Sequence, residues 1–358
     1  MFDACYNGSF HEDDYIAGEY LFNDGGTLAA QGNTRNVLQD RWTIEMIGLL
    51  SHGMRVGQYN RLVATLEGHL MGDPTLRFAP VEANTMSADA TLRKTDTDYW
   101  KGLLGSPYAD VQSLALRMLA DADTDRTLSP MLLEVYRTSP FNTVRMEAVK
   151  LLSRYNNSDF TEAVRLGIND PYELVARLSA DHAGNIGDPS LLPALILLYI
   201  DGNERARAAY NASNSLSLFP IDDVVKAVED YYASSNRYNA VAEKERVING
   251  LKRTHNNFVK RTNDEIADTT LSDDKRISSI RFVRNNPYHP YLDLYLGIIE
   301  DSANSDAVRV TMAEALGWFN HSVRRQEIID FCNHMLKRDD LPDTLSAELL
   351  QTLNRMQN

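Results

Sequence analysis

A short pattern of the type Val-Arg-x-x-Ala recurs along this chain and restricts the folds open to it. Copies are found at Val144-Arg145 with Ala148, at Val175-Ala176-Arg177 with Ser179, and at Val308-Arg309 running into Ala313, and Val111 with Ala115 is a weaker copy. The first three valines in chain order, at 111, 144 and 175, are 33 and 31 residues apart. This spacing is typical of a two-helix unit repeated along the chain.

The turns between these units recur as well. They read Ser106-Pro107-Tyr108, Ser139-Pro140-Phe141, Asp170-Pro171-Tyr172 and, later, Asn286-Pro287-Tyr288. Proline is favoured at the start of a helix, so each unit is expected to restart at the same place. Helix pairs cannot bury their apolar faces alone, and neighbouring pairs must therefore stack. The pattern resembles HEAT-type repeats over roughly residues 100–358 and predicts an all-α superhelical array.

The beginning of the chain follows a different pattern. Residues 1–4 and 27–30 are short apolar runs that suit strands, and residues 13–22 between them have helical spacing. Strand, helix and strand in this order predict a right-handed crossover between parallel strands. Residues 43–50 and 56–70 predict two further helices. We therefore expect an α/β part at residues 1–80, a polar linker at 81–98 and the array at 99–358.

Charge and composition restrict the partners. The chain has a net charge of -14, 43% apolar residues and 24% charged residues, which is typical of a folded protein. Phosphate binding needs clustered Lys and Arg, so nucleic acid is not an expected partner. No apolar run approaches the roughly 20 residues that span a bilayer, so no membrane span is predicted. We predict no cofactor.

The two cysteines, Cys5 and Cys332, have neither the spacing of a disulfide framework nor that of a metal site. Cys332 precedes His334 by two residues, but two potential ligands without a second pair indicate packing, and no metal is predicted. A buried structural thiol is one interpretation of Cys5, because unpaired cysteine is among the most buried residue types.

The other interpretation of Cys5 is a nucleophile. The run Ala4-Cys5-Tyr6-Asn7-Gly8-Ser9-Phe10 is similar to the nucleophile motif of gingipain-type cysteine peptidases, whose domain has a caspase-like fold. Residues 27–32 look like that family's next strand, and Gly72-Asp73-Pro74-Thr75-Leu76-Arg77 resembles the segment that closes its domain. By this resemblance Cys5 attacks a protein or peptide substrate, and its backbone N–H forms part of an oxyanion hole. Residues 1–80 would then be the end of a caspase-like parallel-sheet domain.

The resemblance also places other residues. The family's general-base histidine lies upstream of the cysteine, where this chain has only four residues, so we expect the chain as given to be inactive. Asn33, Thr34 and Trp42 follow the second strand and are the candidate wall of a substrate pocket, with a core aromatic as the competing interpretation of Trp42. His11, His52 and His69 are expected to be surface or capping residues. Family members are commonly secreted or periplasmic, and the resemblance implies the same here.

Two functions follow from the sequence. The first is a fragment of a cysteine endopeptidase with Cys5 as nucleophile. The second is a non-catalytic helical-repeat scaffold that binds a protein partner and carries a degenerate peptidase remnant.

Overall fold

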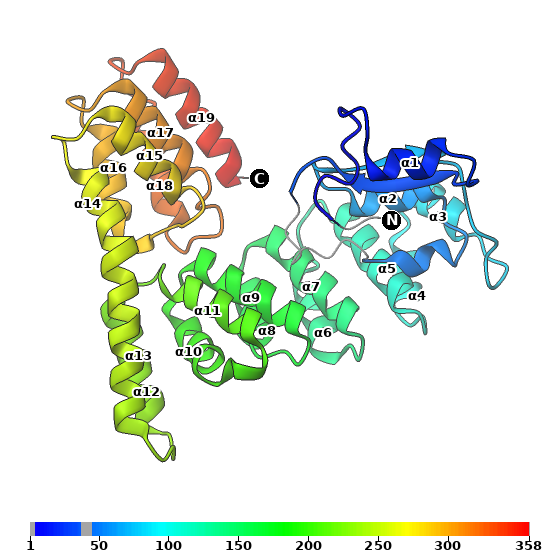
Figure 1. Cartoon of the computed structure of the whole chain (residues 1–358), viewed down its shortest axis with the longest axis horizontal. Coiled ribbons are helices and arrows are strands. Elements are labelled where there is room, and N and C mark those ends of the chain that lie inside the picture. The colour runs from blue at the N-terminus through cyan, green and yellow to red at the C-terminus, as the bar shows by residue number, and fades with distance from the viewer. Residues whose placement is uncertain (1–3, 37–44, 358) are drawn as a thin grey trace. The chain divides into compact units, whose positions relative to one another are not determined.

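The computed structural model describes residues 4–36 and 45–357, and the side chain of Asn203 is outside the description. The chain divides into two compact units, residues 1–155 and 156–358. Most of the described residues are helical (Figure 1). The predicted boundaries at residues 80 and 98 stay a prediction, although α3 forms inside the segment predicted as a linker.

The first unit combines a small sheet with the first helices of the array. Its elements are α1 (Ile16–Phe22), β1 (Ala29–Asn33), η1 (Ile47–Leu50), α2 (Val56–Val63), β2 (Gly68–Gly72), α3 (Met86–Leu92), α4 (Thr97–Leu103), α5 (Ala109–Ala122), α6 (Ser129–Thr138) and α7 (Asn142–Tyr155).

The sheet corrects the sequence interpretation of this unit. β1 and β2 pair antiparallel, with Ala29 opposite Gly72 and Asn33 opposite Gly68, so the predicted parallel crossover is wrong for the described residues. The predicted helix at residues 56–70 ends at Val63, and the chain then enters β2. Two features favour this pairing: Gly72 adopts φ 93°, and a Cβ there would lie 2.3 Å from the carbonyl oxygen of Leu28. Only glycine fits both demands.

The resemblance to gingipain-type peptidases is wrong for the same reason. A caspase-like domain requires a parallel sheet, whereas the described part of the chain is mostly helical and its strands form one antiparallel pair. The segment around Cys5 also runs antiparallel to β1, because Tyr6 and Gly8 donate their N–H groups to the carbonyls of Arg35 and Asn33. The predicted strand at residues 1–4 lies almost wholly outside the described residues. Export, which this resemblance implied, stays a prediction.

One hydrophobic core joins α2, which precedes β2, to the helices α3, α4 and α5. It contains Tyr59 of α2, Met86 of α3, Trp100 of α4 and Leu114 of α5, all buried. Trp100 is fully buried and donates its indole N–H to the carbonyl oxygen of Arg93 at 2.7 Å, which satisfies its single polar atom.

A buried ionic cluster completes this unit. Arg117 of α5 makes a bidentate pair with Glu147 of α7, at 2.8 and 2.7 Å, and also contacts Glu45 at 3.0 Å. Lys150 of α7 pairs with Glu45, and Arg117 donates to the carbonyl oxygen of Leu62 as well. Two cationic side chains balance two carboxylates inside the cluster, as buried charges require. The cluster also joins the segment before α2 to α5 and α7 of the array.

The second unit is all-helical. Its elements are α8 (Ser158–Gly167), α9 (Glu173–Ile186), η2 (Pro189–Leu191), α10 (Leu192–Asp201), η3 (Gly202–Glu204), α11 (Ala206–Leu216), α12 (Ile221–Ala233), α13 (Ala240–Thr254), η4 (His255–Lys260), α14 (Arg261–Ala267), α15 (Asp273–Val283), η5 (His289–Tyr291), α16 (Leu292–Glu300), α17 (Asp306–Leu316), α18 (Arg325–Met335) and α19 (Asp343–Gln357).

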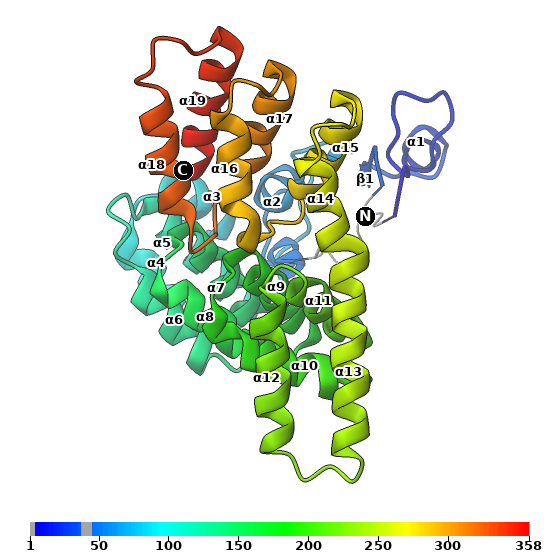
Figure 2. The ribbon, with the colours of Figure 1, turned by 90° about the vertical axis from the view of Figure 1, so that its left-hand side faces the viewer.

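The helices of this unit pack as neighbouring pairs, which confirms the predicted helical-repeat fold. α9 packs on α11, α15 on α17 and α17 on α19. α12 and α13 lie side by side, and α13, the π-helical segment η4 and α14 continue one another as a single rod (Figure 2).

Two buried arginines of the second unit, Arg309 of the recurring pattern and Arg276, make the same contact. Arg309 donates Nε–H to the carbonyl oxygen of Ile299 at 2.8 Å, and Arg276 donates Nε–H to that of Ile266 at 3.0 Å. Each carbonyl belongs to the end of the preceding helix, ten residues earlier, where no backbone N–H follows to satisfy it. A buried arginine at the start of the second helix therefore caps the first helix in both repeats.

Three of the four recurring turns share a side-chain hydrogen bond, whereas in the fourth the Tyr288 N–H donates to the backbone carbonyl of Asn286 at 2.8 Å. The Ser106 hydroxyl, the Ser139 hydroxyl and the Asp170 carboxylate each accept from the backbone N–H two residues later, at 3.2, 3.3 and 2.8 Å. α5, α7 and α9 begin directly after these turns. The side chain before the proline therefore fixes the point where each second helix starts.

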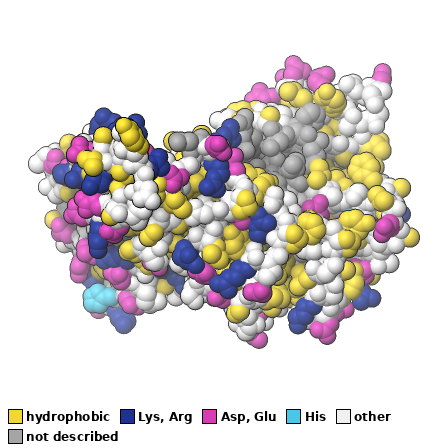
Figure 3. All heavy atoms as spheres, turned by 90° about the horizontal axis from the view of Figure 1, so that it is seen from below, with side chains coloured by type: hydrophobic (Ala, Val, Ile, Leu, Met, Phe, Trp, Pro, Cys, Tyr) yellow, Lys and Arg dark blue, Asp and Glu magenta, His cyan; other side chains and the backbone are white. Residues whose placement is uncertain are grey.

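Three further observations concern function. Within residues 4–36 and 45–357, none of the helices combines the length and apolar character needed to cross a membrane. In the same residues, no three His, Cys, Asp or Glu side chains come together as ligands for a metal ion. On the face shown in Figure 3, Lys and Arg side chains are interspersed with Asp and Glu.

Candidate functional site

Cys5, the predicted nucleophile, is exposed in a turn, so the alternative of a buried structural thiol does not fit the structure. The next residue, Tyr6, has φ 59°, and the turn packs tightly on β1. A Cβ on Gly8 would lie 2.6 Å from the carbonyl carbon of Gly32, so the two backbones are in direct contact only because both residues are glycine. The run around Cys5 thus has a packing role through Gly8, and the catalytic role of Cys5 stays a prediction.

The nearby histidines have other contacts. His69 of β2 places Nε2 3.0 Å from the carbonyl oxygen of Gly8, and its ring packs edge-on against Phe10 at 4.9 Å between centroids. His11 is exposed and lies 3.5 Å from the carboxylate of Glu12. His52 packs edge-on against Tyr108, with 4.6 Å between the ring centroids.

The predicted substrate-binding residues hold the backbone of the sheet. Asn33 is buried, donates its backbone N–H to Oδ1 of Asn7 at 2.8 Å and directs its amide toward the carbonyl of Ala4 at 3.4 Å. Thr34 bonds the carbonyl oxygen of Glu67 through both its N–H and its hydroxyl, at 3.0 and 3.3 Å. Trp42 lies outside the described residues. The pocket role of all three stays a prediction.

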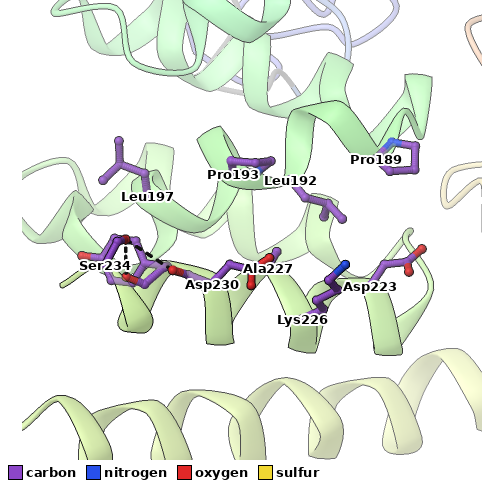
Figure 4. A pocket seen from close by; sticks show the side chains of 10 residues that line it. Pro189, Leu192, Pro193, Leu197, Asp223, Lys226, Ala227, Asp230 and Ser234 are labelled. Atoms are coloured by element: carbon purple, nitrogen blue, oxygen red, sulfur yellow. Dashed lines mark hydrogen bonds between the residues drawn. The ribbon is translucent and has the colours of Figure 1, made fainter.

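The second unit has a groove that the sequence did not predict. It is a hollow of about 660 Å³ between α10 and α12, a size typical of sites that bind ligands or peptide side chains. Figure 4 shows its residues in two rows, one from η2 and α10 and one from α12, on either side of the open space.

One wall of the groove is a single stripe of α12. Its residues are Asp223, Lys226, Ala227, Asp230, Tyr231 and Ser234. Positions separated by three and four residues lie on one face of a helix, so this stripe runs along about three turns, or roughly 16 Å. The opposite side of α12 carries the buried residues Val224, Val228 and Tyr232, which pack the helix onto the array.

The other wall is apolar. Leu192, Pro193 and Leu197 of α10, together with Pro189 of η2, line it. Pro193 is exposed and Leu197 is 39% exposed, although helices of this array bury most of their large apolar side chains. Both prolines occupy the first turn of a helical segment, where no N–H partner is lost, so they give this wall a rigid surface.

A polar network closes one end of the groove. The Tyr231 hydroxyl donates to Asp201 at 2.7 Å, and Arg237 pairs with Asp201 and, through two bonds of 2.9 and 3.0 Å, with Glu243. These residues come from α10, α12, α13 and the loop between the last two. The network therefore fixes the separation of the two groove walls and the position of the Tyr231 ring.

The groove has a defined charge pattern. Asp223 and Asp230 lie on either side of Lys226 along the stripe, facing the apolar wall. All three are exposed. An apolar wall opposite a row of alternating charges suits a ligand that is itself amphipathic, because apolar area supplies affinity and the charges fix orientation. The amphipathic period of residues 223–234 was the sequence signal for this site, but on its own it is equally typical of a helix that only packs.

Comparisons with known proteins add little to this picture. The chain matches no family model and none of the curated proteins searched. Among solved structures it is similar to human deoxyhypusine hydroxylase in complex with glycerol, at 12% identity and a TM-score of 0.26, over 66% of this chain and 98% of that one. A likeness at that TM-score carries no argument about function.

Proposed function

We propose that this chain is a non-catalytic, HEAT-type helical-repeat scaffold that binds an amphipathic helix of a partner protein in the groove between α10 and α12. The observation that carries this proposal is the α12 stripe, where three exposed charged residues and the half-buried Ala227 and Tyr231 face an apolar wall over about three turns. Recognition of a helix in a groove uses apolar anchors at helical spacing, and a stripe of three turns matches a partner helix of similar length.

The groove chemistry specifies the partner helix. Exposed apolar area on Pro193 and Leu197 favours leucine-like anchors. On the partner helix, Asp223 and Asp230 favour two basic residues, and Lys226 favours an acidic residue between them, about one turn from each. Such complementary charges contribute orientation and selectivity more than affinity, because the groove rim is open to water.

A designed peptide tests this proposal. The peptide is a helix-forming 14-mer with two leucines on one face and Lys, Glu and Lys flanking that face at helical spacing. The scaffold should bind it, as measured by fluorescence anisotropy. Leu197→Asp should weaken binding by more than about tenfold, since it places a charge at the apolar anchor site. Leu197 is partly exposed, so the variant is expected to fold.

A matched control separates the groove from the rest of the surface. Leu350 of α19 is 54% exposed and lies outside the groove, and Leu350→Asp should leave the anisotropy titration unchanged. Equal loss in both variants would contradict the groove as the binding site. Circular dichroism of each variant checks that the helices are retained.

A further inference from the structure

A second hollow of the second unit differs from the groove in its chemistry. It has a volume of about 590 Å³ and is lined by α9, α11, the α13–η4 rod, α15 and the turn after α15. Its polar side chains include Asp181 and Asn185 of α9 and Asn214 of α11. None of its lining residues is Lys, Arg, His or Glu. Asp181 is therefore the single formal charge on the wall.

The side chains of this hollow have unused hydrogen-bonding capacity. Asp181, Asn185 and Asn214 make no side-chain hydrogen bonds with the described residues. Asp181 and Asn214 are exposed and Asn185 is half-buried, so water can reach them in the free protein. Here they face the hollow, which leaves one carboxylate and two amides available to a ligand.

The Asp181 side chain is exposed, but protein partly surrounds its carboxylate. Surrounding protein removes water from the carboxylate and raises its pKa to about 6, and the charge of Arg177, one turn earlier on α9, offsets only part of this effect. A carboxylate that is partly desolvated and lacks a hydrogen-bonded partner gains most when a ligand supplies a positive charge.

Exposed aromatic rings surround the same hollow. Tyr210 of α11 is 67% exposed, Phe258 of η4 is 53% exposed and Phe282 of α15 is 49% exposed. Exposed apolar area that gathers at one place marks a binding surface more often than single exposed residues do. Aromatic faces attract ammonium and guanidinium groups, most strongly where water is partly excluded.

From these observations we propose that the hollow binds an Arg or Lys side chain of an extended peptide segment. Asp181 pairs with the cationic group, the rings of Phe258, Phe282 and Tyr210 enclose its stem, and the amides of Asn185 and Asn214 bond the adjoining peptide groups. An amide carries one carbonyl and one NH₂, which match the N–H and C=O of a peptide. Anionic ligands are disfavoured, because they would meet a carboxylate and no cation.

This inference concerns a site separate from the α10–α12 groove and does not depend on it. The test uses the full chain labelled with ¹⁵N and three capped peptides, acetyl-Gly-Ala-Arg-Ala-Gly-amide and its citrulline and glutamate counterparts. Citrulline keeps the shape of arginine without its charge. The arginine peptide should shift resonances of α9 and α11, and its affinity should exceed that of either counterpart by more than about tenfold.

Variants assign the effect to the hollow. Asp181→Asn should weaken arginine-peptide binding by more than about tenfold and Phe282→Ala by severalfold. The control Glu229→Gln removes an exposed carboxylate of α12 that lines neither site and should change nothing. Leu197→Asp, which blocks the groove, should also leave this peptide's affinity unchanged, so failure of either site can be recognised separately.

Three results with the wild-type chain would overturn the inference. They are equal binding of the arginine and citrulline peptides, absence of binding by the arginine peptide at millimolar concentration, and saturable binding of maltotriose in the same hollow in place of the peptide. The last result would show that the aromatic rings and amides of the hollow bind a neutral sugar and not a cationic side chain. Retention of full affinity in Asp181→Asn would exclude the carboxylate as the partner of the cation.

Discussion

His289 reaches the carbonyl oxygen of Gly184 through Nε2 at 2.8 Å, across 105 positions of the sequence. Its Nδ1 lies 3.0 Å from the Ser322 hydroxyl, so the neutral ring donates to the carbonyl and accepts from the hydroxyl. The same ring packs over Gly187, where φ is 69° and a Cβ would lie 2.3 Å from it. This buried contact joins the end of α9 to η5 and to the loop before α18.

The first prediction concerns this contact. His289→Ala should lower the free energy of unfolding by about 2–4 kcal/mol, because it leaves a buried carbonyl unsatisfied and opens a cavity. Gly187→Ala should also destabilise the protein, because the new methyl group would clash with the His289 ring and because alanine disfavours the left-handed backbone conformation at this position. Urea denaturation monitored by circular dichroism measures both. An unchanged midpoint in both variants would show that the contact contributes nothing.

The second prediction is a loss of stability in mild acid. Burial lowers the pKa of His289 to about 4 and that of His182 to about 3, and burial also lowers that of His321. Unfolding returns these groups to a pKa near 6.5, so the unfolded state binds more protons between about pH 6.5 and 4. The stability they contribute is full above pH 6.5 and is lost as the pH falls toward 4.

A variant isolates this effect. His182 packs edge-on against Phe160, with 5.0 Å between centroids, and its buried Nδ1 has no hydrogen-bond partner among the described residues. His182→Phe should raise the melting temperature at pH 5 more than at pH 7.5, because it removes one of the titrating groups. The same shift at both pH values would argue against titration of His182 as the cause.

The third prediction concerns the ionic cluster of the first unit. Although burial opposes its charge, the carboxylates of Glu147 and Glu45 raise the pKa of Arg117, so it stays charged. Glu147→Gln should therefore lower the free energy of unfolding by about 3–5 kcal/mol, because a buried guanidinium loses its bidentate partner. The double variant Arg117→Met with Glu147→Leu should recover part of that loss. Equal destabilisation by the single and double variants would contradict this account.

The fourth prediction links stability to binding at Asp181. Its raised pKa means that the folded state favours the protonated carboxyl, so stability falls as the pH rises from about 4 to about 6. Asp181→Asn should raise the melting temperature at pH 7.5 and weaken binding of the arginine peptide. The affinity of the wild type for this peptide should fall as the pH drops below about 6. Arg177 is the charged group that acts on this carboxylate, and the other residues lining the hollow are uncharged. A lower melting temperature in Asp181→Asn would contradict this prediction.

Local patterns in the sequence predicted the array but not the sheet or the sites. The Ser-Pro-Tyr and Asp-Pro-Tyr turns act through hydrogen bonds between residues two apart, as at Asp170 and Tyr172, so the sequence shows them directly. The antiparallel packing of the Cys5 segment on β1 depends on the close approach of Gly8 to Gly32, a contact between residues 24 apart. The groove depends on the separation of α10 and α12, which the contact between Asp201 and Tyr231 fixes. The hydrophobic periodicity of a sequence carries no information on the distance between two helices.

The peptidase interpretation was wrong for a related reason. The motif around Cys5 contains an asparagine and a glycine, and both have packing roles that a short match does not distinguish from catalysis. Asn7 accepts the backbone N–H of Asn33, and Gly8 allows the contact with Gly32. These residues are required by the antiparallel arrangement itself, whatever Cys5 does.

The fifth prediction tests the proposed groove function most directly, by exchange of charge. The triple variant Asp223→Lys, Lys226→Glu, Asp230→Lys reverses the sign of every charge on the α12 stripe and leaves the apolar wall intact. Anisotropy titrations compare it and the wild type with the designed Lys-Glu-Lys helix and with its Glu-Lys-Glu counterpart. The account predicts that the wild type prefers the first peptide, that the variant prefers the second, and that each preference exceeds about tenfold. The same preference in both proteins, or binding of neither peptide, would contradict it.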